Sequence, residues 1–196
     1  NTLLIFASDN GGSDAENNDV RYPGGPYPNG PLCGDNAPLH GKKGDLYEGG
    51  VRVPTIVHWP ARWASGIYPH PTMIVDWMPT LCRLAGYEGE GTRRWDGVDL
   101  VDALDSGEAP DRETPMYLKG LHGKSRAIRV GDWKLLEFDE AEGTRTELYD
   151  LSVDPCETRN QAAEEAARVV ELKAALVEAS KADGDAQLAT EIRPAE

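Results

Sequence analysis

The chain has 196 residues, of which 39% are apolar and 28% are charged, so it suits one globular domain or a core with a small appendage. Its 34 acidic and 20 basic residues give a net charge of −14, which argues against nucleic acids and anionic membranes as partners. Apolar runs stay well short of the ~20 residues that a membrane span needs, and three cysteines are too few for a disulfide scaffold.

The first predicted element is a buried strand. Residues Thr2–Ala7 form a continuous apolar run that ends at the turn-forming residues 8–12. Because the run begins at Asn1 with neither a methionine nor a signal peptide, we expect the chain to be a segment of a longer protein. Residues 13–41 are polar and rich in Gly, Pro and Asn, which predicts a long irregular loop of the kind that is usually functional.

A second strand and a helix are expected after the loop. Pro54–Trp59 predicts the strand. Residues 72–85 predict the helix, and Gly86 is its expected C-terminal cap. Pro79 lies inside the helical pattern, so the helix is expected to kink or to begin near Asp76. The apolar stripe of this helix consists of Ile74, Met78, Leu81 and Ala85.

The C-terminal part of the chain has a different pattern, which follows a polar linker over residues 105–112. Short strands separated by turn residues predict an antiparallel meander, at 115–119, 127–130, 133–138 and 147–149. A final amphipathic helix is expected over 161–181, packed on that sheet.

The turn after the first strand carries a candidate metal site. Asp9 and Asn10 place a carboxylate and an amide oxygen at the C-terminal end of a strand, where open α/β sheets bind their ligands. Two adjacent oxygen donors suit a hard divalent cation such as Ca²⁺ or Mg²⁺. The same residues also suit an Asx turn without a metal, so the residues alone leave both interpretations open.

The glycine-flanked segment Gly41–Arg52 is a candidate anion site. Its Lys42 and Lys43 reverse the local charge of an acidic protein, and the flanking glycines leave the backbone accessible. The spacing is not that of a P-loop, and a solvated basic loop is the alternative interpretation. Glu48 and Arg52 lie four residues apart and could pair to support the segment.

Several sequence blocks, taken together, resemble the C-terminal half of the sulfatase family, which belongs to the alkaline-phosphatase-like superfamily. They occur in family order and are Ser8–Gly11, Pro38–Gly44, Tyr47–Pro54, Asp76–Leu81, Asp96–Leu100, Gly131–Leu135 and Glu147–Leu151. The resemblance implies an α/β fold in which residues 1–105 are the C-terminal part of an alkaline-phosphatase-like α/β core. Residues 106–182 would form a small antiparallel sheet with a C-terminal helix, and residues 183–196 a flexible tail.

The resemblance also implies roles for single residues. Asp9 and Asn10 match the family's Asp-Asn pair that ligates a divalent cation, generally Ca²⁺, with Mg²⁺ as the alternative. Lys43, four residues before Tyr47, matches the family lysine that contacts the sulfate group. Its charge would offset negative charge in the transition state, so Lys43 is expected to be both catalytic and substrate-binding. Lys42 is expected to be solvated.

The histidines have less definite expectations. His122 lies in a loop that enters the small sheet, where related sulfatases reach toward the substrate, and is a candidate substrate contact. His40 stands where the family commonly has an arginine. His58, inside a strand that is expected to be buried, and His70, in a proline-flanked loop, are expected to be structural or solvated.

The family's nucleophile is not found in this chain. It is a formylglycine made from a Cys/Ser-x-Pro-x-Arg motif, which is not present at any of the cysteines, Cys33, Cys82 and Cys156. We therefore expect the nucleophile upstream, in a missing N-terminal part of the same protein, and expect this chain alone to be inactive.

The complete enzyme would hydrolyse sulfate monoesters, of carbohydrates or of aryl alcohols. The alternatives are a phosphonate or phosphate ester hydrolase of the same superfamily and a non-catalytic scaffold fragment. Family resemblance implies a periplasmic, secreted or lysosomal location, which the residues of this chain do not themselves determine.

Overall fold

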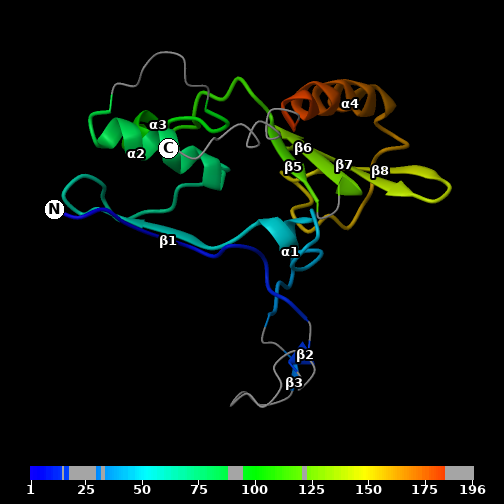
Figure 1. The fold of residues 1–196 in the computed structure, drawn as a ribbon, viewed down its shortest axis with the longest axis horizontal. Helices are drawn as coiled ribbons and strands as arrows, with labels where there is room; N and C mark the ends of the chain where they lie inside the picture. Colours follow the sequence, from blue (N-terminus) through cyan, green and yellow to red (C-terminus); the bar gives the residue numbers. More distant parts are fainter. Residues whose placement is uncertain (15, 18–29, 32–33, 88–94, 121–122, 184–196) are drawn as a thin grey trace, which may run out of the picture. The chain divides into compact units, whose positions relative to one another are not determined.

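The structure, a computed structural model, describes residues 1–14, 16–17, 30–31, 34–87, 95–120 and 123–183 (Figure 1). Contacts divide the chain into two compact units: residues 1–6 with 55–114, and residues 7–54 with 115–196. Residues 7–54 thus belong to the same unit as the C-terminal sheet, whereas residues 55–114 belong to the other. The predicted flexible tail lies outside the described residues, except for Asp183, which bonds to Lys119.

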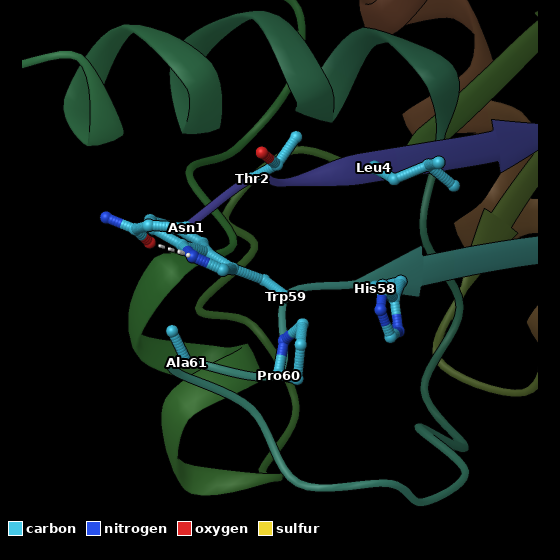
Figure 2. A pocket seen from close by; sticks show the side chains of 7 residues that line it. All are labelled: Asn1, Thr2, Leu4, His58, Trp59, Pro60 and Ala61. Carbon is cyan, nitrogen blue, oxygen red and sulfur yellow. Dashed lines mark hydrogen bonds between the residues drawn. The ribbon is translucent and has the colours of Figure 1, made fainter.

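The strand pair of the first unit consists of β1 (Leu4–Ala7) and β4 (Thr55–His58). The two strands run in opposite directions, because Ser8, just after β1, donates its N–H to the carbonyl of Pro54, just before β4 (3.2 Å). The opposed arrowheads in Figure 2 show the same orientation. Both strands were predicted from their apolar runs, and both are confirmed.

The expectation that the first strand is fully buried was wrong. Leu4 and Phe6 are 53% and 57% exposed, and Ile56 of β4 is 59% exposed. His58 is exposed as well. A continuous apolar run predicts burial only if other elements cover both faces, and within the described part of the chain β1 pairs with β4 alone.

The helix begins where the proline predicted. A short 3₁₀ turn, η1 (Ile74–Asp76), leads into α2 (Trp77–Leu84). Pro79 occupies the third residue of α2, where a missing N–H costs no intrahelical hydrogen bond. Gly86 has φ +72°, the left-handed conformation expected of the glycine that ends a helix.

The face that this helix buries differs from the prediction. Ile74 and Met78 of the apolar stripe are 74% and 58% exposed, whereas Thr80 is completely buried. The Thr80 hydroxyl donates to the Asp76 carbonyl (2.6 Å) and accepts the N–H of Leu100 (2.9 Å). Contact with the segment before α3 (Val101–Ser106) therefore decides which face of α2 is buried.

A buried carboxylate holds the first unit together. Asp76 is 0% exposed and accepts hydrogen bonds from the backbone N–H groups of Met73 (2.7 Å) and Val98 (2.9 Å). The guanidinium of Arg112 lies 2.5 Å from the same carboxylate. Asp76 thus links η1, the turn before α3 and the end of the unit.

Replacement of Asp76 by alanine is expected to destabilise the complete protein by about 3–5 kcal/mol, because it leaves the charge of Arg112 and two N–H groups without their partner. Denaturant unfolding measures this change. Asp102→Ala is the control, since the Asp102 side chain is 80% exposed in its pair with Arg83 and should contribute little. Equal losses for the two variants would contradict the assignment.

The second unit is built on the predicted meander, which is confirmed. Its sheet has the order β5-β6-β7-β8 with antiparallel pairs throughout (Figure 1). The strands are β5 (Met116–Lys119), β6 (Ser125–Val130), β7 (Trp133–Glu140) and β8 (Gly143–Asp150). The final helix, α4 (Ala166–Ser180), begins five residues later than expected.

Both faces of this sheet are covered. Leu135 of β7 packs with Leu172 and Leu176 of α4 on one face. The next residue, Leu136, packs with Leu46 on the other face. Because side chains alternate along a strand, α4 covers one face and the loop that leads into α1 (Glu48–Val51) covers the other. This packing explains why the loop 7–54 groups with the C-terminal sheet.

Two further elements lie in the loop that was predicted to be irregular. Strands β2 (Glu16–Asn17) and β3 (Gly30–Pro31) form a short antiparallel pair. Within the described residues, no helix is long and apolar enough to cross a membrane.

Candidate functional site

The two segments that carry the predicted site residues lie against each other in the second unit. Gly11, in the turn after β1, donates its N–H to the carbonyl of Gly50 in α1 (2.9 Å). Lys43 donates its backbone N–H to the carbonyl of Gly12 in the same turn (3.0 Å). Residues 40–47, which contain Lys42 and Lys43, are called the lysine loop below. The structure thus brings the Asp9–Asn10 turn and the lysine loop together through backbone hydrogen bonds.

This close approach requires glycine. A Cβ atom on Gly11 would lie 1.8 Å from the carbonyl oxygen of Gly49, and one on Gly49 would lie 2.4 Å from the carbonyl oxygen of Gly41. Atoms cannot approach that closely, so a larger residue would force the segments apart. The glycines singled out for access to an anion therefore have a second role, in the packing of backbone on backbone.

Asn36 braces both segments and was not found from the sequence. Its Oδ1 accepts the N–H of Gly12 (2.6 Å), and its Nδ2 donates to the carbonyls of Gly12 (2.9 Å) and Gly41 (3.3 Å). Asn36 is 24 residues from Gly12, and an asparagine in a loop rich in Gly, Pro and Asn gives no local signal of such a contact.

The two neighbouring lysines have different surroundings. Lys42 pairs with Asp14 (2.8 Å) at the surface, where the two side chains are 51% and 63% exposed. The hydrogen bond lowers the pKa of Asp14 and raises the pKa of Lys42. Lys43 is exposed, and its ammonium group has no hydrogen-bond or ionic partner among the described residues. Of the two cations, Lys43 is the one whose charge is available to a ligand.

A hollow of about 370 Å³ adjoins this loop. Its lining combines charged and amide groups with the apolar rings and chains of the loop, and consists of Asp14, Asn36, Ala37, Pro38, Leu39, Gly41, Lys42 and Asp45.

Asp9 and Asn10 have the chemistry of a partial metal shell. The exposed Asp9 carboxylate has no hydrogen-bond or ionic partner within the described part of the chain. The Asn10 side-chain nitrogen donates to the carbonyl of Gly11 (2.9 Å), which leaves the amide oxygen available. Two hard oxygen donors fit Ca²⁺ or Mg²⁺, but a Ca²⁺ shell needs about 6–8 oxygens. Within the described residues, three or more His, Cys, Asp or Glu side chains do not converge on one point, so other ligands must complete the shell.

Aromatic contacts support the lysine loop. The rings of His40 and Tyr47 stack at 3.9 Å, and the Tyr47 hydroxyl donates to Glu147 of β8 (2.7 Å). Burial, together with the hydrogen bond to Glu147, raises the pKa of Tyr47 to about 12. The His40 position, where the family commonly has an arginine, is therefore filled by a ring that stacks on the loop's own tyrosine.

Tyr47→Phe is expected to lower the stability of the complete protein by about 1 kcal/mol at pH 8, because the hydrogen bond to Glu147 is lost. The folded state holds the Tyr47 proton more tightly than the unfolded state does, so this contribution is fully present below pH 10. It is lost as the pH rises through about 12. Urea unfolding at several pH values should show the difference between wild type and variant closing over this range. A pH-independent difference would contradict the prediction.

The expected pair between Glu48 and Arg52 was wrong. The Glu48 carboxylate instead pairs with Lys134 of β7 (2.8 Å), and the Arg52 backbone N–H donates to the Glu48 carbonyl (2.7 Å). Local spacing favoured Arg52, whereas the sheet packed on α1 supplies a buried cation.

The remaining residues singled out from the sequence are His122 and the three cysteines. His122 and Cys33 lie outside the described residues. Cys82 and Cys156 are free thiols, each partly buried.

A second hollow, of about 300 Å³, lies in the first unit and is shown in Figure 2. The lining consists of Asn1, Thr2, Leu4, His58, Trp59, Pro60 and Ala61. These side chains include neither a carboxylate nor a lysine or arginine, so they do not form the kind of site expected for a metal or a sulfate group.

Comparison with known proteins identifies the family. The profile of the Sulfatase family matches residues 1–87. The steryl-sulfatase of Mus musculus is 35% identical over 142 residues, which cover 70% of this chain and 21% of that protein. The chain therefore belongs to the sulfatase family, and it spans about a fifth of the length of that relative.

Solved structures agree on the fold. The crystal structure of Ps i-CgsB in complex with k-i-k-neocarrahexaose has a TM-score of 0.69 at 28% identity, covering 94% of this chain and 36% of that one. The structure of BT4656 in complex with D-glucosamine-2-N,6-O-disulfate has a TM-score of 0.57 at 26% identity, covering 72% of this chain and 30% of that one. The expected α/β class, with an antiparallel sheet and a C-terminal helix, is confirmed.

Proposed function

We propose that the complete protein hydrolyses sulfate monoesters and that this chain is the C-terminal part of the enzyme. The observation that carries the proposal is the ammonium group of Lys43, which has no partner among the residues that the structure describes, on a loop hydrogen-bonded to the turn of Asp9 and Asn10. Membership of the sulfatase family gives this arrangement its chemistry.

Each residue has a separate role in this proposal. The Asp9 carboxylate and the Asn10 amide oxygen would hold a divalent cation, Ca²⁺ before Mg²⁺, which supplies positive charge next to the sulfate oxygens. The Lys43 ammonium would bind the sulfate and offset the charge that develops in the transition state. His122 is proposed to contact the substrate. A formylglycine upstream of this chain would supply the nucleophile.

Carbohydrate sulfates are the proposed substrate class. Two structural relatives that are more than 25% identical hold a neocarrahexaose and a glucosamine disulfate. The hollow that Lys42 lines also presents the carboxylates of Asp14 and Asp45, which suit the hydroxyl groups of a sugar.

Relative turnover tests the proposed function. The complete protein should hydrolyse a nitrophenyl sulfate at least about a hundredfold faster, in kcat/KM, than the matching phosphonate and phosphate esters. The reverse preference would favour a phosphonate or phosphate ester hydrolase. The complete protein would act as a scaffold if it hydrolysed none of the three.

This chain by itself is expected to have no measurable turnover, because the proposed nucleophile lies outside it. Purified residues 1–196 are assayed beside the complete protein with the same sulfate ester and added Ca²⁺. Turnover by the short chain that a substitution at one of its own residues abolishes would contradict this prediction.

A further inference from the structure

A buried ion network lies behind the candidate site. The Lys134 ammonium is 2.8 Å from one Glu48 oxygen and 2.8 Å from one Glu157 oxygen. The second Glu157 oxygen accepts the backbone N–H of Glu48 (2.6 Å). The side chains of Lys134, Glu48 and Glu157 are only 1%, 6% and 0% exposed, respectively. Desolvating charged groups is costly, so a buried ion pair contributes little to stability by itself. This network can instead fix the positions of the segments that it joins.

The network joins three parts of the second unit. Glu48 is the first residue of α1, Lys134 belongs to β7, and Glu157 lies in the turn that follows β8. Glu157 is the only non-glycine residue of the described chain with a positive φ, +54°. Such a conformation persists only where the surroundings hold it. Burial raises the pKa of Glu157, and the ammonium of Lys134 opposes that rise.

The network reaches the candidate site through the backbone of α1. Gly49, next to Glu48, donates its N–H to the carbonyl of His40 at the start of the lysine loop (2.6 Å). The carbonyl of Gly50 accepts the N–H of Gly11, which follows the Asp9–Asn10 turn (2.9 Å). A shift of Glu48 would therefore move the backbone that touches both segments.

We propose that Lys134, Glu48 and Glu157 form a positioning network that sets the lysine loop relative to the Asp9–Asn10 turn. None of the three touches the reacting groups. The network acts through α1, and its catalytic consequence rests on the proposed sulfatase function. Its structural consequence, the anchoring of the loop, does not.

Glu157→Gln in the complete protein is the decisive variant. One Glu157 oxygen faces the Lys134 ammonium (2.8 Å) and the other accepts the Glu48 N–H (2.6 Å). A glutamine is neutral and has one oxygen only, so it must give up either Lys134 or the Glu48 N–H. The matched control is Glu137→Gln. Glu137 lies in β7 and, like Glu157, is a buried carboxylate with cationic partners, in this case Arg126 (3.0 Å) and Lys173 (3.1 Å). Among the described residues, the Glu137 carboxylate pairs with these two cations and makes no hydrogen bond or ion pair with α1.

The kinetic measurement separates positioning from general destabilisation. Glu157→Gln is expected to lower kcat/KM for an aryl sulfate by roughly ten- to a hundredfold, since small misplacements of catalytic groups have effects of this size. Glu137→Gln should leave it within about threefold at a comparable loss of Tm. In a Lys43→Ala background the effect of Glu157→Gln should shrink, because the two changes act on one interaction. Full additivity, or equal losses for Glu157→Gln and Glu137→Gln, would overturn the proposal.

Hydrogen exchange provides a readout that does not depend on activity. Amide exchange across residues 40–50 should rise at least about tenfold in Glu157→Gln and stay unchanged in Glu137→Gln. Unchanged exchange in both variants would overturn the anchoring role even if the complete protein proved not to be a sulfatase. If Glu157→Gln does not fold, Lys134→Arg replaces it, because this variant keeps the charge and changes the geometry. It should show the same loss of kcat/KM and the same rise in amide exchange, and the absence of either would overturn the proposal.

Discussion

If the complete protein is the proposed sulfatase, alanine at position 43 should lower its kcat/KM for an aryl sulfate by about a hundredfold, equivalent to about 3 kcal/mol of transition-state stabilisation. The reason is that Lys43 carries an exposed ammonium group with no partner in the described part of the chain, on a loop hydrogen-bonded to the Asp9–Asn10 turn. Steady-state kinetics with metal content checked in parallel measure the effect.

Lys42→Ala is the matched control for this loss. Lys42 is the adjacent residue and has the same charge, but its ammonium group pairs with Asp14 at the surface, so its removal should change the rate by less than about threefold. A larger loss for Lys42→Ala than for Lys43→Ala would show that the match to the family block is displaced by one residue, and the anion site with it.

Asp9→Ala should abolish stoichiometric metal binding and lower kcat/KM by about a thousandfold, or about 4 kcal/mol. Asp9 supplies the only carboxylate of the Asp9–Asn10 pair, and a Ca²⁺ shell that loses a charged ligand is left incomplete. Elemental analysis after dialysis and a Ca²⁺ titration of activity test the two effects separately.

Asp14→Ala is the control for metal loss. Asp14 is an exposed carboxylate five residues after Asp9, and it pairs with Lys42. It is not a proposed metal ligand, so its removal should leave the metal content unchanged. An Asp9→Ala enzyme with full metal content and an unchanged rate would show that Asp9 is only a turn residue.

Sequence motifs predicted the residues of the candidate site, but they did not predict Asn36, whose hydrogen bonds hold its two segments together. The Asp9–Asn10 turn and the lysine loop each form a short continuous block, so each could be matched to a family pattern. Their roles stay predictions, but the structure does bring the two blocks together. Asn36, which braces both blocks, gives no local signal, because its contacts are made with backbone atoms far along the chain.

Local sequence patterns by themselves predicted β1, β4, α2, the strands of the C-terminal sheet and α4, but not β2, β3 or α1. Short strand-like runs separated by turn residues predicted the meander, and Pro79 with Gly86 predicted the limits of α2. These signals act over a few residues, since they reflect backbone conformation and the periodicity of side chains.

Only the tertiary structure decided which faces are buried and which charges pair. Leu4 and Ile74 are as apolar as core residues, yet both are exposed, because burial depends on what lies opposite. Glu48 has Arg52 four residues away but pairs with Lys134, 86 residues distant, since β7 packs beneath α1 and a buried carboxylate needs a cation within hydrogen-bond distance. Such partners are set by the packing of distant segments, which no local pattern records.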